Sequence, residues 1–288
     1  MAQAWERLSR HPDNRGMQSN PIQAHAPLQK VLAIDTSTEH LSIALGAAGD
    51  GTPVAVYEGP GGAHASAALV PVVQRLLAEA GWTLAELDAI AFGCGPGSFT
   101  GLRTACAVVQ GLAVAGRSGG IPVLPVNTLL AVAEEARWQW QSQGQDMPAR
   151  MVAAMDARMD EMYVAEVAFQ PDSGLTLVGE PWLCSPEALP ESLAVCADGS
   201  HALLAGNGAA IYGGRLPPVW QAAPQLAALP KAAAMLRLAP ALWAQGLAVD
   251  AAGAQPLYVR DKVAQTTEER ERIKAAKLAA QAAEGVRV

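Results

Sequence analysis

Residues 31–45 read VLAIDTSTEHLSIAL, and the fold class is predicted from this stretch. Val31–Ile34 is a compact apolar run typical of a buried strand, and Leu41–Leu45 is a second one. The hydroxyl-rich turn Asp35–Thr38 lies between them, and a third strand is predicted at Val54–Tyr57. The pattern therefore indicates a β-meander at the start of the ordered chain.

Two helices and another strand are expected after the meander. Apolar residues recur at helical spacing over about His64–Ala80, with Pro71 inside that stretch and Gly81 suited to cap its end. A short strand is predicted at Asp88–Gly93, and a second helix at about Thr100–Ala115. This alternation is typical of an α/β protein.

The second part of the chain begins with two predicted strands, Met151–Met155 and Met162–Phe169, joined by the charged turn Asp156–Glu161. A helix is expected at Lys231–Gln245, and Pro256–Arg260 has a strand-like pattern. The region between is rich in proline and glycine, which indicates a less regular structure. No internal repeat is visible in the sequence.

The predicted organisation is two domains with a tail at each end, and its boundaries follow the changes in composition. These are a flexible extension at residues 1–29, an N-terminal domain at 30–128 with a return at about 231–263, a smaller second domain at 129–230, and a charged tail at 264–288. We expect the tail to be a marginal helix or a disordered segment.

Composition limits the functional classes. The 288 residues carry a net charge of −7, which argues against a protein that binds nucleic acid by itself, so any tRNA contact is expected through a partner. An apolar run of about 18 residues and a signal peptide are both missing, so we expect a cytoplasmic protein without a membrane span. Its four cysteines are expected to be reduced thiols.

The turn formed by Asp35, Thr36 and Ser37 allows two interpretations. Its hydroxyls could donate to a phosphate while the aspartate orients water on a metal ion. Alternatively, these side chains close a tight hairpin, and the tetrapeptide alone favours this second interpretation.

The most specific stretch is Gly95–Arg103, which reads GPGSFTGLR. A glycine-rich loop that leads into a helix can bind an anion, and Gly95, Gly97 and Ser98 are the candidate residues. It is not a P-loop, because the Gly-Lys-Ser/Thr that defines one is missing. The sequence therefore leaves a nucleotide site, with ATP or ADP and magnesium, open without firm support for any cofactor.

The helix at residues 102–115 is apolar on all sides, which predicts burial on all sides. One side would pack on the sheet, and the other would face either the second domain or a partner chain; both alternatives stay open. If it faces a partner, the candidate interface residues are Leu69, Val73, Leu76, Leu102, Arg103, Cys106, Val109, Gln110 and Leu112.

Catalytic and metal-binding patterns are missing from the sequence. No His-x-x-x-His, His-Glu-x-x-His or Gly-x-Ser-x-Gly motif occurs. Asp156, Asp160 and Glu161 surround Arg158, and we interpret them as a salt-bridged turn rather than a metal site.

Several separated motifs together resemble the TsaB (YeaZ) family over about residues 30–263. They are Val31–Thr38, Gly95–Arg103, Asp156–Tyr163, Gly206–Ala209 and Pro256–Arg260. The catalytic paralogue TsaD also has a Gly-Pro-Gly loop, but the Asp-Ala-Arg turn and the short chain favour TsaB.

The resemblance implies an α/β fold of two actin-like (ribonuclease H-like) domains, each a mixed sheet flanked by helices, with the second reduced. It also implies a non-catalytic scaffold subunit for making threonylcarbamoyladenosine in tRNA, with TsaD and TsaE as partners and a possible homodimer. TsaD carries metal-binding histidines, whereas this sequence lacks a matching pair of histidines and has His64 as its single candidate. The alternative is an independent ATP-dependent kinase or transferase.

Overall fold

A computed structural model describes residues 28–47, 52–148, 150–170 and 174–260. The predictions for residues 1–27 and for the tail from residue 264 lie outside the described residues. By their contacts, the described residues up to Leu257 form one unit, and Tyr258–Arg260 belong to another.

Sheet A has five strands in the order β3-β2-β1-β4-β5. Their bounds are Val31–Asp35 (β1), His40–Gly46 (β2), Pro53–Pro60 (β3), Ala89–Gly95 (β4) and Val123–Asn127 (β5). β1, β2 and β3 pair antiparallel, so the predicted meander is confirmed, while β4 and β5 run parallel to β1.

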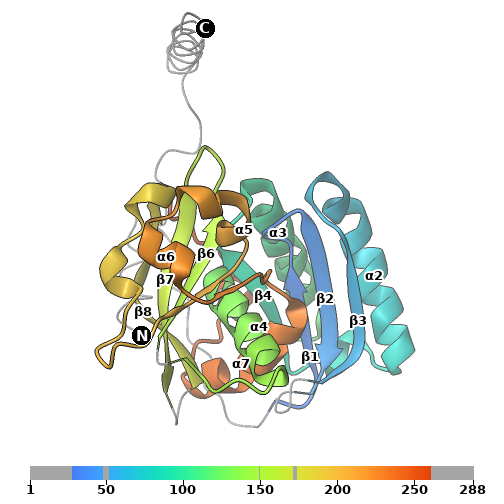
Figure 1. Cartoon of the computed structure of the whole chain (residues 1–288). Helices are drawn as coiled ribbons and strands as arrows, with labels where there is room; N and C mark the ends of the chain where they lie inside the picture. Colours follow the sequence, from blue (N-terminus) through green and yellow to red (C-terminus); the bar gives the residue numbers. More distant parts are fainter. Residues whose placement is uncertain (1–27, 48–51, 149, 171–173, 261–288) are drawn as a thin grey trace, which may run out of the picture. The chain divides into compact units, whose positions relative to one another are not determined.

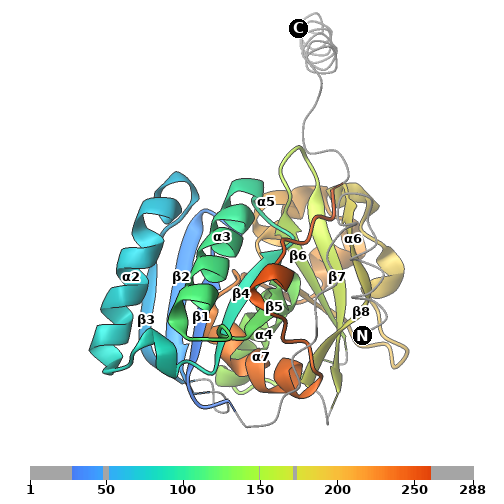
Figure 2. The same cartoon turned by 180° about the vertical axis from the view of Figure 1, so that it is seen from behind.

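Helices cover both faces of sheet A. α2 (Ala65–Ala80) and α3 (Phe99–Gly116) pack on one face, and α7 (Ala232–Ala244) packs on the other (Figures 1 and 2). α4 (Thr128–Ser142) contacts α7 and the strands of both sheets. By length and hydropathy α3 would suffice to cross a membrane, but one of its faces packs along β4. Its other face is exposed at Val114, so the prediction that residues 102–115 are buried on all sides is wrong within this chain.

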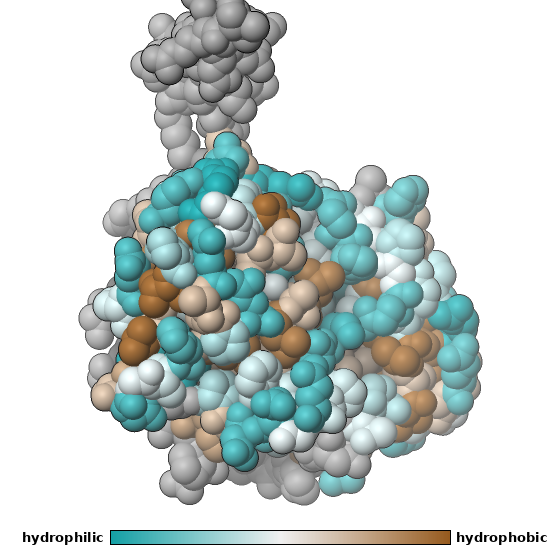
Figure 3. All heavy atoms as spheres, in the orientation of Figure 1, coloured by the Kyte–Doolittle hydropathy of each residue, from teal (hydrophilic) through white to brown (hydrophobic). Residues whose placement is uncertain are grey.

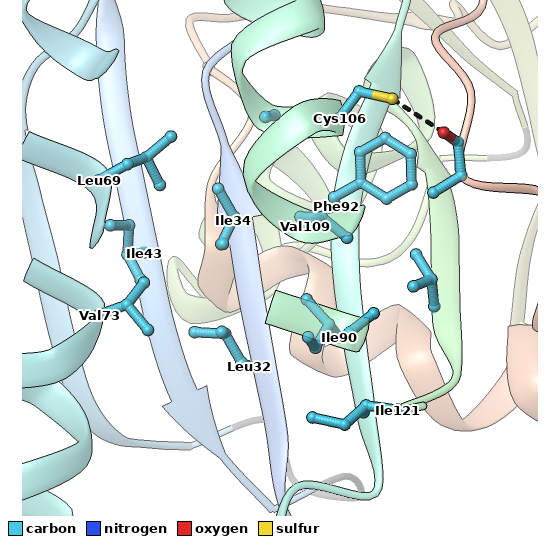
Figure 4. Close-up of a cluster of buried hydrophobic side chains, with 14 of the residues drawn as sticks. Leu32, Ile34, Ile43, Leu69, Val73, Ile90, Phe92, Cys106, Val109 and Ile121 are labelled. Carbon is cyan, nitrogen blue, oxygen red and sulfur yellow. Dashed lines mark hydrogen bonds between the residues drawn. The ribbon is translucent and has the colours of Figure 1, made fainter. Parts of the chain in front are cut away.

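The core between sheet A and its outer helices explains why the strands are so apolar. Side chains from β1 and β4, such as Ile34 and Phe92, meet Leu69 of α2 and Val109 of α3 (Figure 4). The thiol of Cys106 donates to the carbonyl oxygen of Ala254 over 2.8 Å, which ties the returning chain to α3. Burial of this kind contributes about 25 cal/mol per Å² of apolar surface.

Sheet B repeats the plan of sheet A. Its order is β10-β9-β6-β7-β8, with an antiparallel meander β6-β7-β8 and two strands, β9 and β10, parallel to β6. The bounds are Met151–Asp156 (β6), Met162–Gln170 (β7), Gly174–Cys184 (β8), Leu203–Ala205 (β9) and Gln225–Leu226 (β10). This duplication, with short helices α5 (Gly208–Tyr212) and α6 (Pro218–Ala222), is the expected two-domain α/β fold.

Two details differ from the sequence-based expectation. The strand-like pattern at Pro256–Arg260 is wrong as a strand, because these residues are in no strand. Pro256 has no N–H to donate, and Leu257 N makes a single bond to Cys94 O at 2.6 Å. The prediction also missed β8, whose register against β7 shifts at Gly179–Pro181 and so breaks the apolar alternation.

Buried charges join α4 to α7. Glu134 and Glu135 are almost fully buried, and Arg237 binds both, at 2.7 and 2.9 Å. Lys231 also reaches Glu135, at 3.0 Å. Burial raises the pKa of Glu135, but hydrogen bonds from Gln139, Lys231 and Arg237 outweigh that effect and leave the pKa below its usual value. These contacts thus favour the charged form of Glu135 inside the protein.

We predict that Arg237→Met lowers the free energy of unfolding by about 1.5–3 kcal/mol, because both buried carboxylates lose a charged hydrogen-bond donor, while Arg137 still binds Glu134 and Lys231 still binds Glu135. Urea unfolding measures the loss. Arg75→Met is the matched control, since Arg75 pairs with Glu79 on the exposed side of α2, and it should cost less than about 1 kcal/mol. Equal losses in the two variants would contradict the assigned role of Arg237.

Candidate functional site

The two loops singled out from the sequence meet at the ends of β1 and β4. Thr36 Oγ1 donates to Gly101 O at 2.7 Å, and Ser98 N donates to Ser37 O at 2.7 Å. Ser98 also caps α3, because its hydroxyl accepts from Gly101 N at 3.4 Å. All six candidate nucleotide-binding residues therefore belong to one cluster, formed by the β1–β2 turn and the glycine loop.

Glycines allow these two loops to touch. A Cβ on Gly97 would lie 2.6 Å from Ser37 O, and a Cβ on Gly101 would collide with the backbone carbonyl of Thr36. Gly95 has a φ of 125°, a conformation that other residues rarely adopt. The space left by the missing side chains is thus filled by the backbone of the β1–β2 turn. In a phosphate-binding loop, the same space would hold the ligand.

Asp35 is enclosed beneath this contact. Its side chain is 1% exposed; Oδ1 accepts from Ser37 N at 3.0 Å and from Ser37 Oγ at 2.8 Å. Oδ2 has no hydrogen-bond partner among the residues that the structure describes, and it lies against Gly93, where any Cβ would collide with it. Burial raises the pKa of Asp35 from 3.8 to about 7, although the hydrogen bonds from Ser37 act in the opposite direction.

In this conformation the β1–β2 turn of the cluster is sealed from solvent, whereas Gly97 and Ser98 of the glycine loop are half-buried. Thr36 and Ser37 are as buried as Asp35, and their hydroxyls already donate to protein oxygens. The nearby cation, Arg103, is exposed and lies over the Phe99 ring, 3.8 Å from its centroid. Among the described residues, no three histidines, cysteines or carboxylates are grouped to hold a metal ion.

Most candidate interface residues lie inside the chain's own core. Six of the nine are buried: Leu69, Val73, Leu76, Leu102, Cys106 and Val109. Leu112 and Gln110 are half-buried, Gln110 donating to Ala254 O at 2.9 Å, and Arg103 is exposed. The buried six face sheet A, so none of them presents a surface to a partner in this fold.

The outward faces of α2 and α3 expose other apolar residues. Val114 of α3 is 69% exposed, next to Ala107 and Gly111 on the same face, and Val70 of α2 is 39% exposed. Figure 2 shows the two helices side by side. The sequence could not identify this face, because a helix that is apolar all round gives no sign of which side meets the sheet.

The charged turn between β6 and β7 occupies the place in sheet B that the Asp35–Thr38 turn occupies in sheet A. Asp156 Oδ1 accepts from Arg158 N at 2.9 Å and from Tyr212 Oη at 2.7 Å, and Asn207 Oδ1 accepts from Asp156 N at 2.9 Å. The predicted salt-bridged turn is present, with Arg215 bound to Asp160 at 2.9 Å. Asn207 is a positioning residue that the sequence signalled only as part of a glycine loop.

We predict a pH signature of buried Asp35. A folded-state pKa above the unfolded value means that its contribution to stability is full below about pH 4 and is lost as the pH rises through about 7. Between pH 5 and 8 the wild type should lose roughly 2–3 kcal/mol more than Asp35→Asn. Denaturant unfolding at several pH values measures this difference, and parallel curves for the two proteins would rule out the raised pKa.

Comparisons with known proteins agree with the geometry. Residues 60–194 match a family model described as "TsaD: tRNA N6-adenosine threonylcarbamoyltransferase". The TsaB biosynthesis protein of Escherichia coli is 35% identical over 82% of this chain and 96% of its own length, and that of Haemophilus influenzae is 34% identical over 81% and 94%.

Among solved structures, YeaZ from Pseudomonas aeruginosa superposes with a TM-score of 0.67 at 39% identity and covers 80% of this chain and 100% of its own. A second structure, titled as similar to peptidase YeaZ from the same organism, has a TM-score of 0.68 at 38% identity over 81% and 100%. Because these relatives are matched over almost their whole length, the chain belongs to the TsaB (YeaZ) family.

Proposed function

We propose that this chain is a non-catalytic scaffold subunit in the biosynthesis of threonylcarbamoyladenosine in tRNA. It binds a TsaD-type transferase, works with TsaE in the cytoplasm, and meets tRNA only through the complex. The relatives named as TsaB biosynthesis proteins support the pathway. The observation that carries the scaffold role is the exposed apolar face of α2 and α3 around Val70 and Val114.

The chemistry of this face suits packing against helices of another chain. Val114 is the most exposed of the large apolar side chains on it, and burying one valine stabilises a complex by about 1.5–3 kcal/mol. Ala107 and Gly111 precede it by seven and three residues and let a second helix approach closely, since a Cβ added at Gly111 meets nothing within 4 Å. We propose that a second copy of this chain uses the same face in a homodimer.

The opposite side of the molecule looks less suited to a partner. Figure 3 views the side on which α4 and α7 cover sheet A, and hydrophobic residues are scattered there among hydrophilic ones. Charged side chains such as Arg237 and Glu134 on that side already bind one another. The outward face of α2 and α3 is therefore our choice for the interface with TsaD.

The non-catalytic part of the proposal is supported by the sealed cluster. A carboxylate that orients metal-bound water must reach solvent, but Asp35 is buried, and its raised pKa weakens it as a ligand. The hydroxyls of Thr36 and Ser37 are occupied, and the glycine loop brings no lysine. An independent ATP-dependent enzyme would need all of these groups free to contact the nucleotide and its metal ion. A nucleotide site would form only in the assembled complex.

We predict that Val114→Asp weakens binding to the TsaD-type partner at least tenfold, about 1.4 kcal/mol, because the new charge must be desolvated in an apolar interface. Since Val114 is exposed in the chain itself, the thermal midpoint should stay within about 2 °C. Calorimetric titration of the purified partner into each variant measures the affinity.

Ile211→Asp serves as the control, since Ile211 is 51% exposed on α5, beside sheet B. It should bind the partner like the wild type. If Val114→Asp also binds normally while both variants are folded, the face of α2 and α3 is not the interface. Val109→Asp is unsuitable for this test, because Val109 is in the core and a charge there would unfold the chain.

A further inference from the structure

One ion pair joins the two equivalent turns of the duplicated fold. Arg158, in the turn after β6, binds Glu39, which follows Asp35–Thr38 in the turn after β1, with 3.1 Å between Nη2 and Oε1. Both side chains are about 70% exposed. Arg158 also lies 3.6 Å from Asp156 of its own turn, so it has an acceptor on each side.

The sheet B turn is held in an unusual shape that positions Arg158. Arg158, Met159 and Asp160 have φ values of 63°, 57° and 60°, in the left-handed region where a residue with a side chain costs roughly 1 kcal/mol. Such a conformation persists only when its surroundings impose it. Asn207 and Tyr212 do so through Asp156, and Arg215 does so through Asp160.

Backbone hydrogen bonds hold the β1–β2 turn of sheet A at Ser37 and Glu39, and the side chain of Glu39 binds Arg158 in solvent. Glu39 O accepts from Gly61 N at 2.8 Å, and Ser37 O accepts from Ser98 N at 2.7 Å. Those two amides report whether the turn is closed, because each loses its acceptor when the turn moves away. Asp35 is buried two residues before Ser37, and its Oδ1 accepts from Ser37 N at 3.0 Å.

We propose that Arg158 is a latch between the two sheets: its bond to Glu39 adds to the buried bonds that hold the β1–β2 turn closed over Asp35, and its release makes transient opening of that turn more frequent. An exposed ion pair contributes only a small free energy, so the latch shifts the balance between closed and open turn rather than locking it. The sheet B turn, through Asn207 and Asp156, sets the position of the latch. The latch belongs to the isolated chain and does not depend on a scaffold role.

Amide hydrogen exchange on the isolated full-length protein tests the latch. Arg158→Ala should speed exchange at Gly61 and Ser98 by about threefold to fivefold, the range expected for an exposed pair. Glu39→Ala should speed the same two amides, and the double variant Glu39→Ala with Arg158→Ala should exchange no faster than either single variant. Asn207→Ala should speed the same two amides, although it touches neither partner of the ion pair.

Arg75→Ala is the matched control. Arg75 is also exposed and paired, but its partner Glu79 lies on α2, so Gly61 and Ser98 should keep wild-type rates. The latch is refuted if Arg158→Ala and Arg75→Ala give the same rates at Gly61 and Ser98. It is equally refuted if the effects of Glu39→Ala and Arg158→Ala add in the double variant.

Discussion

The contact between the β1–β2 turn and the glycine loop is the constraint on which the rest of this structure depends. Thr36 and Ser37 bond to the backbone of the loop, and Gly97 and Gly101 leave no side chain between the two segments. The contact fixes where α3 begins, because Ser98 both bonds to Ser37 and caps the helix. It also buries Asp35 and so shifts its pKa toward neutrality. Two loops of a kind that often binds phosphate therefore serve here to hold the end of β1 against the start of α3.

The same contact between the two loops determines which side of α3 faces solvent. With its first turn fixed against Thr36, α3 directs Leu102, Cys106 and Val109 into the core and Val114 toward solvent. On the other face of sheet A, the buried ion pairs of Arg237 hold α7 to α4, and α4 reaches the strands of sheet B. The two repeats are thus coupled by α4 as well as by the pair of Arg158 and Glu39.

Much of the first repeat could be predicted from the sequence, because its strands are short apolar runs separated by clear turn residues. The loops of the candidate site were found for the same reason. What the sequence could not supply was relative position: that Gly101 packs on Thr36, that Arg237 meets Glu134 a hundred residues away, and that Asn207 holds Asp156. Most of the candidate interface residues lie in the core of the chain, which the sequence could not show, since uniform hydropathy hides helix orientation. The sequence predicted β6 and β7 of the second sheet but showed no internal repeat, because sheet B shares the topology of sheet A but not its sequence. Strand β8 was missed because it bulges at Gly179.

Reconstitution of the modification reaction tests the central claim, that this chain acts as an obligatory partner without chemistry of its own. Purified TsaD, TsaE and the threonylcarbamoyl-adenylate synthase are combined with tRNA, with and without this chain, and threonylcarbamoyladenosine is measured. The account predicts that product forms only when the chain is present, and that Asp35→Asn, which removes the carboxylate from the sealed cluster, supports the reaction as well as the wild type. Equal product without the chain, or loss of activity in folded Asp35→Asn, would contradict it.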